Sequence, residues 1–216
     1  AGFADALAFA RKRSDEIDAT IARFPDRIAP ALTAADAKRL DAEGRLIAFK
    51  SMENSYPLGE DLSLLTEFQR RGVRMASPVH SSNNQFADSA TDEPRWNGLS
   101  PLGRQWVAEM NRLGMMIDAS HASDAAFDQM LALSKTPIIL SHSGSQDVFD
   151  HPRNLDDDRI RKLAAGGGAI CVSTVYLSDM NLSDERAALF ATLERIGELS
   201  PAEQADLTAR WRALDK

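Results

Sequence analysis

The sequence predicts an α/β fold built on parallel strands. Five short, almost continuously apolar runs alternate with stretches in which apolar residues recur every three or four positions. The first pattern is typical of strands covered on both faces, and the second of amphipathic helices. Because parallel neighbours need a crossover connection, strands that alternate with helices favour a parallel sheet. The predicted strands are residues 46–52, 73–79, 115–120, 137–141 and 169–175.

Several predicted helices have recognisable ends. The helix at 3–24 is indicated by its apolar spacing, and the helix at 33–40 by the capping-box pattern of Thr33 and Asp36. The run Gly166–Gly168 predicts a helix C-cap and a turn before the last strand; a phosphate-binding loop would follow a strand instead. The remaining helices are expected at 62–71, 101–113, 123–134, 157–165, 184–197 and 201–213.

Composition places the chain among ordinary globular proteins and excludes several kinds of partner. The 216 residues are 44% hydrophobic and 26% charged, which excludes collagen-like and disordered classes. With 25 basic and 32 acidic residues, the net charge is −7 and no basic block occurs. We therefore expect no nucleic-acid partner and no electrostatic attraction to anionic membranes. No apolar run reaches the roughly 18 residues of a membrane span, and the single cysteine, Cys171, excludes an internal disulfide.

Chemically active side chains follow four of the five predicted strands. Glu53 follows the first, His80 the second, His121 the third and His142 the fourth. In α/β barrels the C-terminal ends of the strands meet at one mouth, so these side chains are expected to converge. Imidazole and carboxylate are the usual ligands of catalytic zinc. A lone histidine at a strand end is more often a structural hydrogen-bonding residue, but two Ser-His-small triplets together with Glu53 favour a metal site.

Other residues near these strand ends have both functional and structural interpretations. Arg153 has the chemistry to bind a substrate carboxylate, or it pairs on the surface with Asp150 or Asp156. Asp118 orients a metal ligand, or it is simply the polar end of a strand. Ser141 precedes a histidine and suggests a nucleophile beside its base. Neighbours in a strand point to opposite faces, however, so contact is not expected.

The residues that carry this chemistry lie in segments that resemble the membrane (renal-type) dipeptidase family, peptidase family M19, a group of zinc peptidases with an amidohydrolase-like barrel. The resemblance extends from about residue 45 to residue 178, in order and with similar spacing. The matching segments are Lys50–Asn54, Gly72–Met75, Pro78–His80 with Asn84, Gly98–Gly103, Glu109–Gly114, Ile117–His121, Ser141–Ser143 and Pro152–Asn154.

The resemblance implies a (β/α)8 TIM barrel of the metallo-dependent hydrolase type, with two zinc ions at its mouth. Glu53 matches the glutamate that bridges both metals, and His121 and His142 match the histidines that complete the protein ligands of one of them. His80 matches a catalytic histidine on the substrate side that polarises the scissile carbonyl. Arg153, with the adjacent Asn154, matches the segment that binds the C-terminal carboxylate of the dipeptide.

The expected activity is therefore zinc-dependent hydrolysis of a dipeptide. The alternatives are another amide or lactam hydrolase of the same barrel type, or a remnant that binds metal or peptide without catalysis. A His-x-Asp motif and a late aspartate of the family pattern do not occur, and no histidine precedes His80.

With about five of eight strands, residues 1–216 are expected to be an internal fragment with a single partial barrel domain. Residues 179–216 would be a helical insertion or extension of that domain. Exposed strand edges would favour aggregation or a homodimer. The first residues do not resemble a signal peptide, so the sequence leaves the compartment open, although the resemblance favours an exported protein.

Overall fold

The computed structural model describes residues 2–176, 183–193, 196 and 199–214. The chain divides into two compact units, Ala1–Leu177 and Ser178–Lys216. All the strands in the described ranges belong to the first unit.

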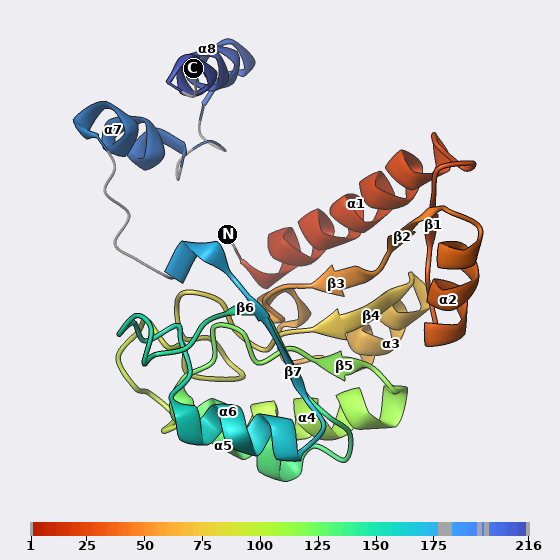
Figure 1. Ribbon diagram of the computed structural model, residues 1–216, viewed down its shortest axis with the longest axis vertical. Helices are drawn as coiled ribbons and strands as arrows, with labels where there is room; N and C mark the ends of the chain where they lie inside the picture. Colours follow the sequence, from red (N-terminus) through yellow and green to blue (C-terminus); the bar gives the residue numbers. More distant parts are fainter. Residues whose placement is uncertain (1, 177–182, 194–195, 197–198, 215–216) are drawn as a thin grey trace. The chain divides into compact units, whose positions relative to one another are not determined.

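Parallel strands form the centre of the first unit, as the sequence predicts (Figure 1). Each predicted strand is present, although most are shorter than predicted. A parallel bridge between Asp118 and Ile139 links two groups of paired strands. In pairing order the strands are β3 (Lys50–Met52), β4 (Val73–Ala76) and β5 (Met116–Ile117), then β6 (Ile139–Ser143) and β7 (Ala169–Val172). The strand predicted at 46–52 is divided at Phe49, and its first part is β2 (Leu46–Ala48).

Amphipathic helices make the crossovers between these strands, and their starts follow the predicted caps. The side chains of Ser100, Ser123 and Asp156 each accept a hydrogen bond from a backbone N–H in the first turn, which satisfies a donor that the helix leaves unpaired. Gly166 is the C-cap of the last crossover helix, as predicted. The helices are α3 (Ser63–Arg70), α4 (Pro101–Leu113), α5 (Asp124–Leu133) and α6 (Asp157–Ala165), and short 3-10 turns occur at Tyr56–Leu58 and Thr174–Tyr176.

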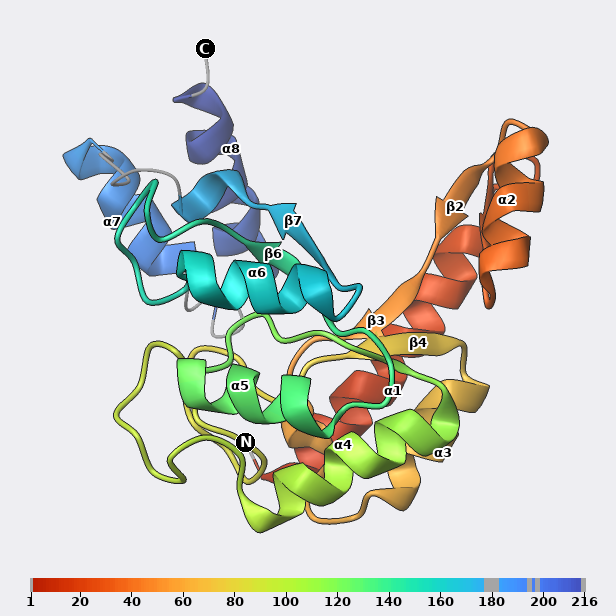
Figure 2. The ribbon, with the colours of Figure 1, turned by 60° about the horizontal axis from the view of Figure 1, so that its bottom comes forward.

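An arm precedes the central strands. We define the arm as residues 28–48, which contain β1 (Ile28–Pro30), α2 (Ala34–Ala42) and β2; the long helix α1 (Phe3–Ala22) comes before it. In the first unit the arm stands away from β3–β5 (Figure 2), and it has a small core of its own, Ala29, Ala31 and Leu40. Strand β1 was not predicted, because three residues that include a proline are too short to show a period.

The main core lies between the crossover helices and the strands. Its largest fully buried side chains include Trp106, Phe68, Phe86 and Phe127. The expectation that strands are covered on both faces is wrong for β7, where Cys171 is exposed and Val172 is 68% exposed. In the part of the chain that the structure describes, β7 pairs with β6 alone.

The second unit contains α7 (Asp184–Leu193) and α8 (Pro201–Ala213), which bury Leu189 and Leu207. The capping box of Ser200 and Glu203 forms as its sequence pattern indicates. Of the helix predicted at 184–197, the described residues contain Asp184–Leu193; residues 194–195 and 197–198 lie outside the described residues. That this segment extends the barrel domain stays a prediction.

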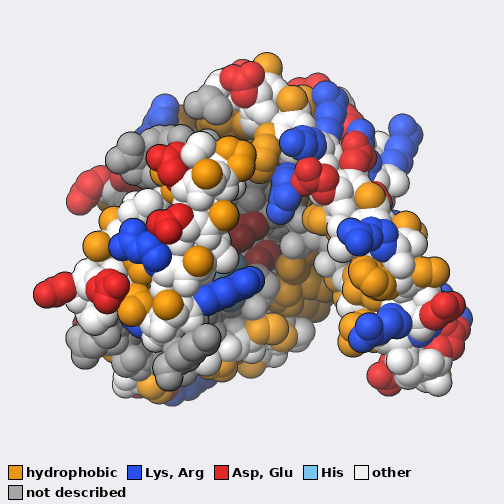
Figure 3. Space-filling model, turned by 90° about the horizontal axis from the view of Figure 1, so that it is seen from above, with side chains coloured by type: hydrophobic (Ala, Val, Ile, Leu, Met, Phe, Trp, Pro, Cys, Tyr) orange, Lys and Arg blue, Asp and Glu red, His pale blue; other side chains and the backbone are white. Residues whose placement is uncertain are grey.

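Charged side chains of both signs are mixed on the surface. On the face in Figure 3, acidic and basic side chains are interspersed instead of separated by sign. Within the described ranges, no helix combines the length and the apolar character that a membrane crossing requires.

Candidate metal centre

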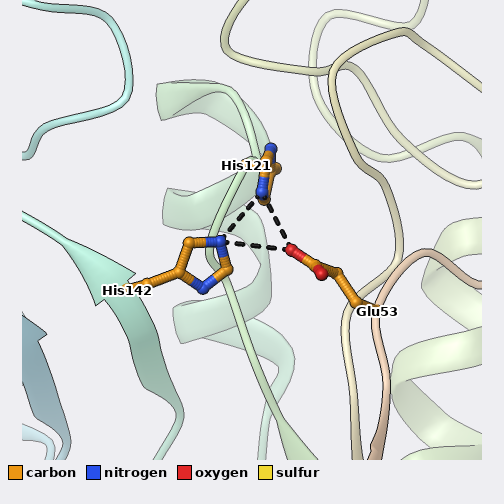
Figure 4. A group of neighbouring side chains, drawn as sticks. All are labelled: Glu53, His121 and His142. Atoms are coloured by element: carbon orange, nitrogen blue, oxygen red, sulfur yellow. Dashed lines mark hydrogen bonds and ion pairs between the residues drawn. The ribbon is translucent and has the colours of Figure 1, made fainter. Parts of the chain in front are cut away.

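Three side chains from separate parts of the sheet point toward one another (Figure 4). The Glu53 Oε1 atom lies 3.1 Å from His121 Nε2 and 3.2 Å from His142 Nε2. The two Nε2 atoms are 2.9 Å apart. Glu53 directly follows β3, His121 lies four residues beyond β5, and His142 lies inside β6, one residue before its end. The predicted convergence at the C-terminal strand ends is therefore confirmed, although His142 belongs to its strand.

This donor set fits a divalent metal ion. The three donor atoms form a compact triangle, and a tetrahedral zinc ion about 2.1 Å from its ligands needs donors about 3.4 Å apart. A small outward movement of the side chains would therefore admit a metal. The ligand atoms also have suitable charge: hydrogen bonding to His121, with the nearby histidines, lowers the pKa of Glu53 to about 2. Burial lowers the pKa of His121, which favours the neutral imidazole that a metal ligand must be.

The His142 ring is oriented by a relay of side chains. Ser141 Oγ lies 2.5 Å from Asp118 Oδ2 and 2.9 Å from His142 Nδ1. A carboxylate oxygen can only accept, so the serine hydroxyl donates to Asp118 and accepts from the histidine. This arrangement puts the His142 proton on Nδ1 and leaves Nε2 free for a metal. The expectation that Ser141 and His142 do not touch is wrong, but His142 is not placed as the base of a serine nucleophile, because the serine hydroxyl donates its proton to Asp118.

The His121 ring has no such support on its far side. Its Nδ1 atom is buried and has no hydrogen-bond partner within the described ranges. The backbone of His121 has φ +71°, in the left-handed region that side chains other than glycine rarely adopt. Such conformations cost about 1–3 kcal/mol and cluster at functional sites. The surrounding structure must therefore hold this part of the backbone in place.

His80 lies beside the triangle on its exposed side. Its Nε2 atom is 3.7 Å from Glu53 Oε1, and its ring centroid is 4.0 Å from that of His121. The side chain is 46% exposed, and Nδ1 contacts the hydroxyl of Ser81 at 3.0 Å. His80 is thus available to a molecule that approaches the three donors.

Arg153 is a buried cation next to the same cluster. It is 4% exposed, donates to the backbone oxygen of His142 at 3.3 Å and lies over the ring of Tyr176, 5.1 Å from its centroid. Burial lowers the pKa of Arg153. Within the described ranges no carboxylate forms an ion pair with its guanidinium, and Asp156 pairs with Arg159 instead. The alternative interpretation, a surface pairing of Arg153 with Asp150 or Asp156, is therefore wrong.

Asn154 has a structural use here. Its amide nitrogen donates to the backbone oxygens of Phe149 and Tyr176, at 2.9 and 2.8 Å. The side chain is 2% exposed. A contact between Asn154 and substrate stays a prediction.

Comparison with known proteins places this donor cluster in a family. The model of the membrane dipeptidase family, peptidase family M19, matches residues 2–205. The chain belongs to the M19 membrane dipeptidase family. "Dipeptidase aclJ" of Aspergillus oryzae is 36% identical over 180 residues, which are 82% of this chain and 42% of the relative. The chain thus spans less than half the length of such curated M19 relatives.

Solved M19-like structures confirm the barrel fold. The probable dipeptidase PvdM from Pseudomonas aeruginosa has a TM-score of 0.76 and 33% identity, over 97% of this chain and 60% of that one. A metallo peptidase from Rhodobacter sphaeroides, liganded with a phosphinate mimic of the dipeptide L-Ala-D-Ala, has a TM-score of 0.67 and 27% identity, over 80% and 53%. The predicted (β/α)8 architecture is therefore confirmed, and this chain holds part of it.

Membership of the M19 family and the Glu53–His121–His142 cluster together establish a metal cofactor. Two residues that contact the site were not predicted to do so from the sequence. Strand geometry argued against the contact of Ser141 with His142, and no sequence pattern links Tyr176 to Arg153.

Proposed function

We propose that the protein to which this chain belongs hydrolyses dipeptides, with zinc held by Glu53, His121 and His142. The observation that carries the proposal is the triangle of metal donors beside a buried arginine that lacks a carboxylate partner within the described ranges. Zinc is favoured over harder cations because two of the three donors are imidazole nitrogens.

Arg153 supports a small substrate with a free carboxylate. A buried guanidinium without an anion is costly, and a carboxylate supplies the charge and the bidentate hydrogen bonds that it lacks. Because Arg153 contacts the backbone of His142 itself, a carboxylate held there would lie close to the metal donors. A long peptide chain would not place a free carboxylate so near the bond to be cut, whereas a dipeptide does.

Each of the other residues in or beside the cluster has a role that follows from its position. Glu53 brings a negative charge, and Asp118 with Ser141 keeps the Nδ1–H tautomer of His142. His80, exposed and beside the triangle, donates a hydrogen bond to the scissile carbonyl and to the oxyanion that develops from it. A bound zinc ion supplies water with a pKa near 7 and therefore a nucleophile at neutral pH.

Zinc content and hydrolysis test the proposal. The purified protein is expected to hold zinc, and His121→Ala to lose the zinc of this cluster. Elemental analysis after metal-free buffer exchange measures this. Unchanged zinc in His121→Ala would contradict the assignment of the ligands.

Substrate chemistry tests the role of Arg153. We expect hydrolysis of an Ala-Ala dipeptide, and a large rise in KM for the same dipeptide with a C-terminal amide. Arg153→Gln should remove that preference, while Arg161→Gln, a change in an exposed arginine of α6, should leave it intact. Zinc binding without hydrolysis of any dipeptide would favour the non-catalytic remnant, and cleavage of a lactam alone would favour the other hydrolase class.

A further inference from the structure

A long loop lies next to the metal cluster and contacts the segments that carry two of its donors. Residues 81–99 lie between β4 and α4, and we call them the bridging loop. Although it lacks regular secondary structure, this loop buries three polar residues almost completely: Asp88 is 1% exposed, Ser89 is 2% exposed and Asn84 is 7% exposed. Buried polar groups in a loop need partners, so their contacts indicate what the loop does.

Asp88 organises the bridging loop from inside. Its two carboxylate oxygens accept the backbone N–H groups of Arg95, Trp96 and Gly98 at 2.9–3.0 Å. Its own backbone N–H donates to the Gly98 oxygen, and its own oxygen accepts from the N–H of Ser123. One carboxylate thus closes the loop on itself, and the backbone of the same residue ties it to the segment that follows His121.

One end of the bridging loop supports the segment that carries Glu53. The Asn84 amide donates to Asn54 Oδ1 at 3.0 Å and to the Pro78 oxygen at 2.7 Å. Asn54 directly follows Glu53 and has φ +71°. Trp96, whose backbone N–H donates to Asp88, donates in turn from Nε1 to the backbone oxygen of Asn84 at 2.8 Å. Asp88 therefore helps to fix the position of Asn84 through Trp96.

The other side of the loop supports His121. The backbone N–H of Ala90 donates to the His121 oxygen at 2.8 Å, and Ser89 forms an antiparallel bridge with Ala122. This support matters because the His121 ring has no partner at Nδ1 in the described part of the chain, and its left-handed backbone conformation persists only where the surrounding structure holds it. The bridging loop therefore holds the backbone of one metal donor, His121, and the side chain of Asn54, which directly follows a second donor, Glu53.

We propose that Asp88 is a positioning residue for the metal centre, which acts by folding the bridging loop so that Ala90 holds the backbone of His121 and Asn84 holds the side chain of Asn54, next to Glu53. The inference rests on the proposed zinc site. In this role the bridging loop holds the donors in place before the metal arrives.

Asp88→Asn tests this inference in the purified protein. The change keeps the shape of the side chain but turns one acceptor into a donor facing backbone N–H groups. We expect zinc affinity, measured by competition with a chromophoric chelator, to fall about 10–100-fold, as for other residues that orient metal ligands. Asp92→Asn is the matched control, because the exposed Asp92 also accepts two backbone N–H groups in this loop. It should change affinity less than about threefold.

Thermal unfolding of the zinc-free variants separates positioning from simple stabilisation. A purely structural Asp88 would lower the unfolding midpoint and leave the zinc affinity of the folded protein unchanged, which would overturn the inference. If Asp88→Asn does not fold, Asn84→Ala replaces it, and an unchanged zinc affinity there also overturns the inference. Failure of the unmodified protein to bind zinc would instead overturn the proposed metal site, and the inference with it.

Discussion

The metal corner and the arm are built on different kinds of contact. The metal corner, which we define as Glu53, His121, His142 and the polar residues that contact them, is joined by hydrogen bonds between polar groups, such as those between Glu53 and His121 and between Asp118 and Ser141. The arm encloses only Ala29, Ala31 and Leu40, and Leu46 on its surface is 63% exposed. Directional hydrogen bonds fix the positions of atoms, whereas a small apolar core gives limited stability. We therefore expect the metal corner to be precise and the arm to open locally.

The largest expected effect is in the main core. Trp106→Ala removes a fully buried ring and leaves Ser55 Oγ without the indole N–H that donates to it at 3.0 Å. We expect a loss of about 3–5 kcal/mol in the free energy of unfolding. Urea denaturation followed by circular dichroism measures it. Trp211→Ala, in the second unit, should leave this transition nearly unchanged, and equal effects of the two changes would contradict the prediction.

The next effect should be confined to the arm. Leu40 is fully buried in the arm's small core, and Leu40→Ala should destabilise that core by about 2–5 kcal/mol. Hydrogen exchange should accelerate in residues 28–48 while zinc affinity stays constant. Leu46→Ala, at an exposed position, is the control. A loss of zinc affinity in Leu40→Ala would show that the arm and the metal corner are coupled.

The relay at His142 should affect metal binding more than folding. Ser141→Ala frees the His142 ring to rotate and to change tautomer. Zinc affinity is expected to fall about 10–100-fold, or about 1.4–2.7 kcal/mol. Ser134→Ala is matched, since Ser134 Oγ also donates a hydrogen bond, to the Thr136 oxygen, away from the cluster. If both changes weaken zinc binding equally, the relay has no specific role.

The smallest expected effect is on the pH dependence of stability, through the ion pair that attaches α1 to α3. Arg11 donates two hydrogen bonds to Glu67, at 2.9 and 2.7 Å, and together with Arg71 it lowers the pKa of Glu67 to about 2. Since this pKa lies below the ordinary value near 4.5, the contribution to stability is complete above pH 4.5 and is lost as the pH falls toward 2. The pair is partly exposed, so we expect less than about 1 kcal/mol. Comparison of unfolding free energies at pH 6 and 3 should show a smaller change in Glu67→Gln than in the unmodified protein.

Much of the fold was predictable because its signals are local. The caps at Ser100 and Asp156 and the apolar period of the helices specify α4 and α6 to the residue. The strand-end positions of Glu53, His121 and His142 predicted a metal site, since parallel strands end at a common edge. Two features of the fold were not predicted, each for a physical reason. Strand β1 is too short to show a hydrophobic period. The exposure of β7 depends on which other segments pack against it, and the hydrophobic period of the strand itself does not contain that information.

By itself, the sequence determined the α/β class, the candidate donors and the resemblance to the M19 family. Only the tertiary structure decided that Ser141 links Asp118 to His142 and that Arg153 is buried without an anion in the described part of the chain. It also decided that residues 81–99 contact the backbone of His121 and the side chain of Asn54, next to Glu53. The physical reason is the separation along the chain over which each kind of interaction acts. Capping and periodicity act within one turn or one strand, whereas hydrogen-bond geometry and the cost of a buried charge depend on residues that are distant in the chain.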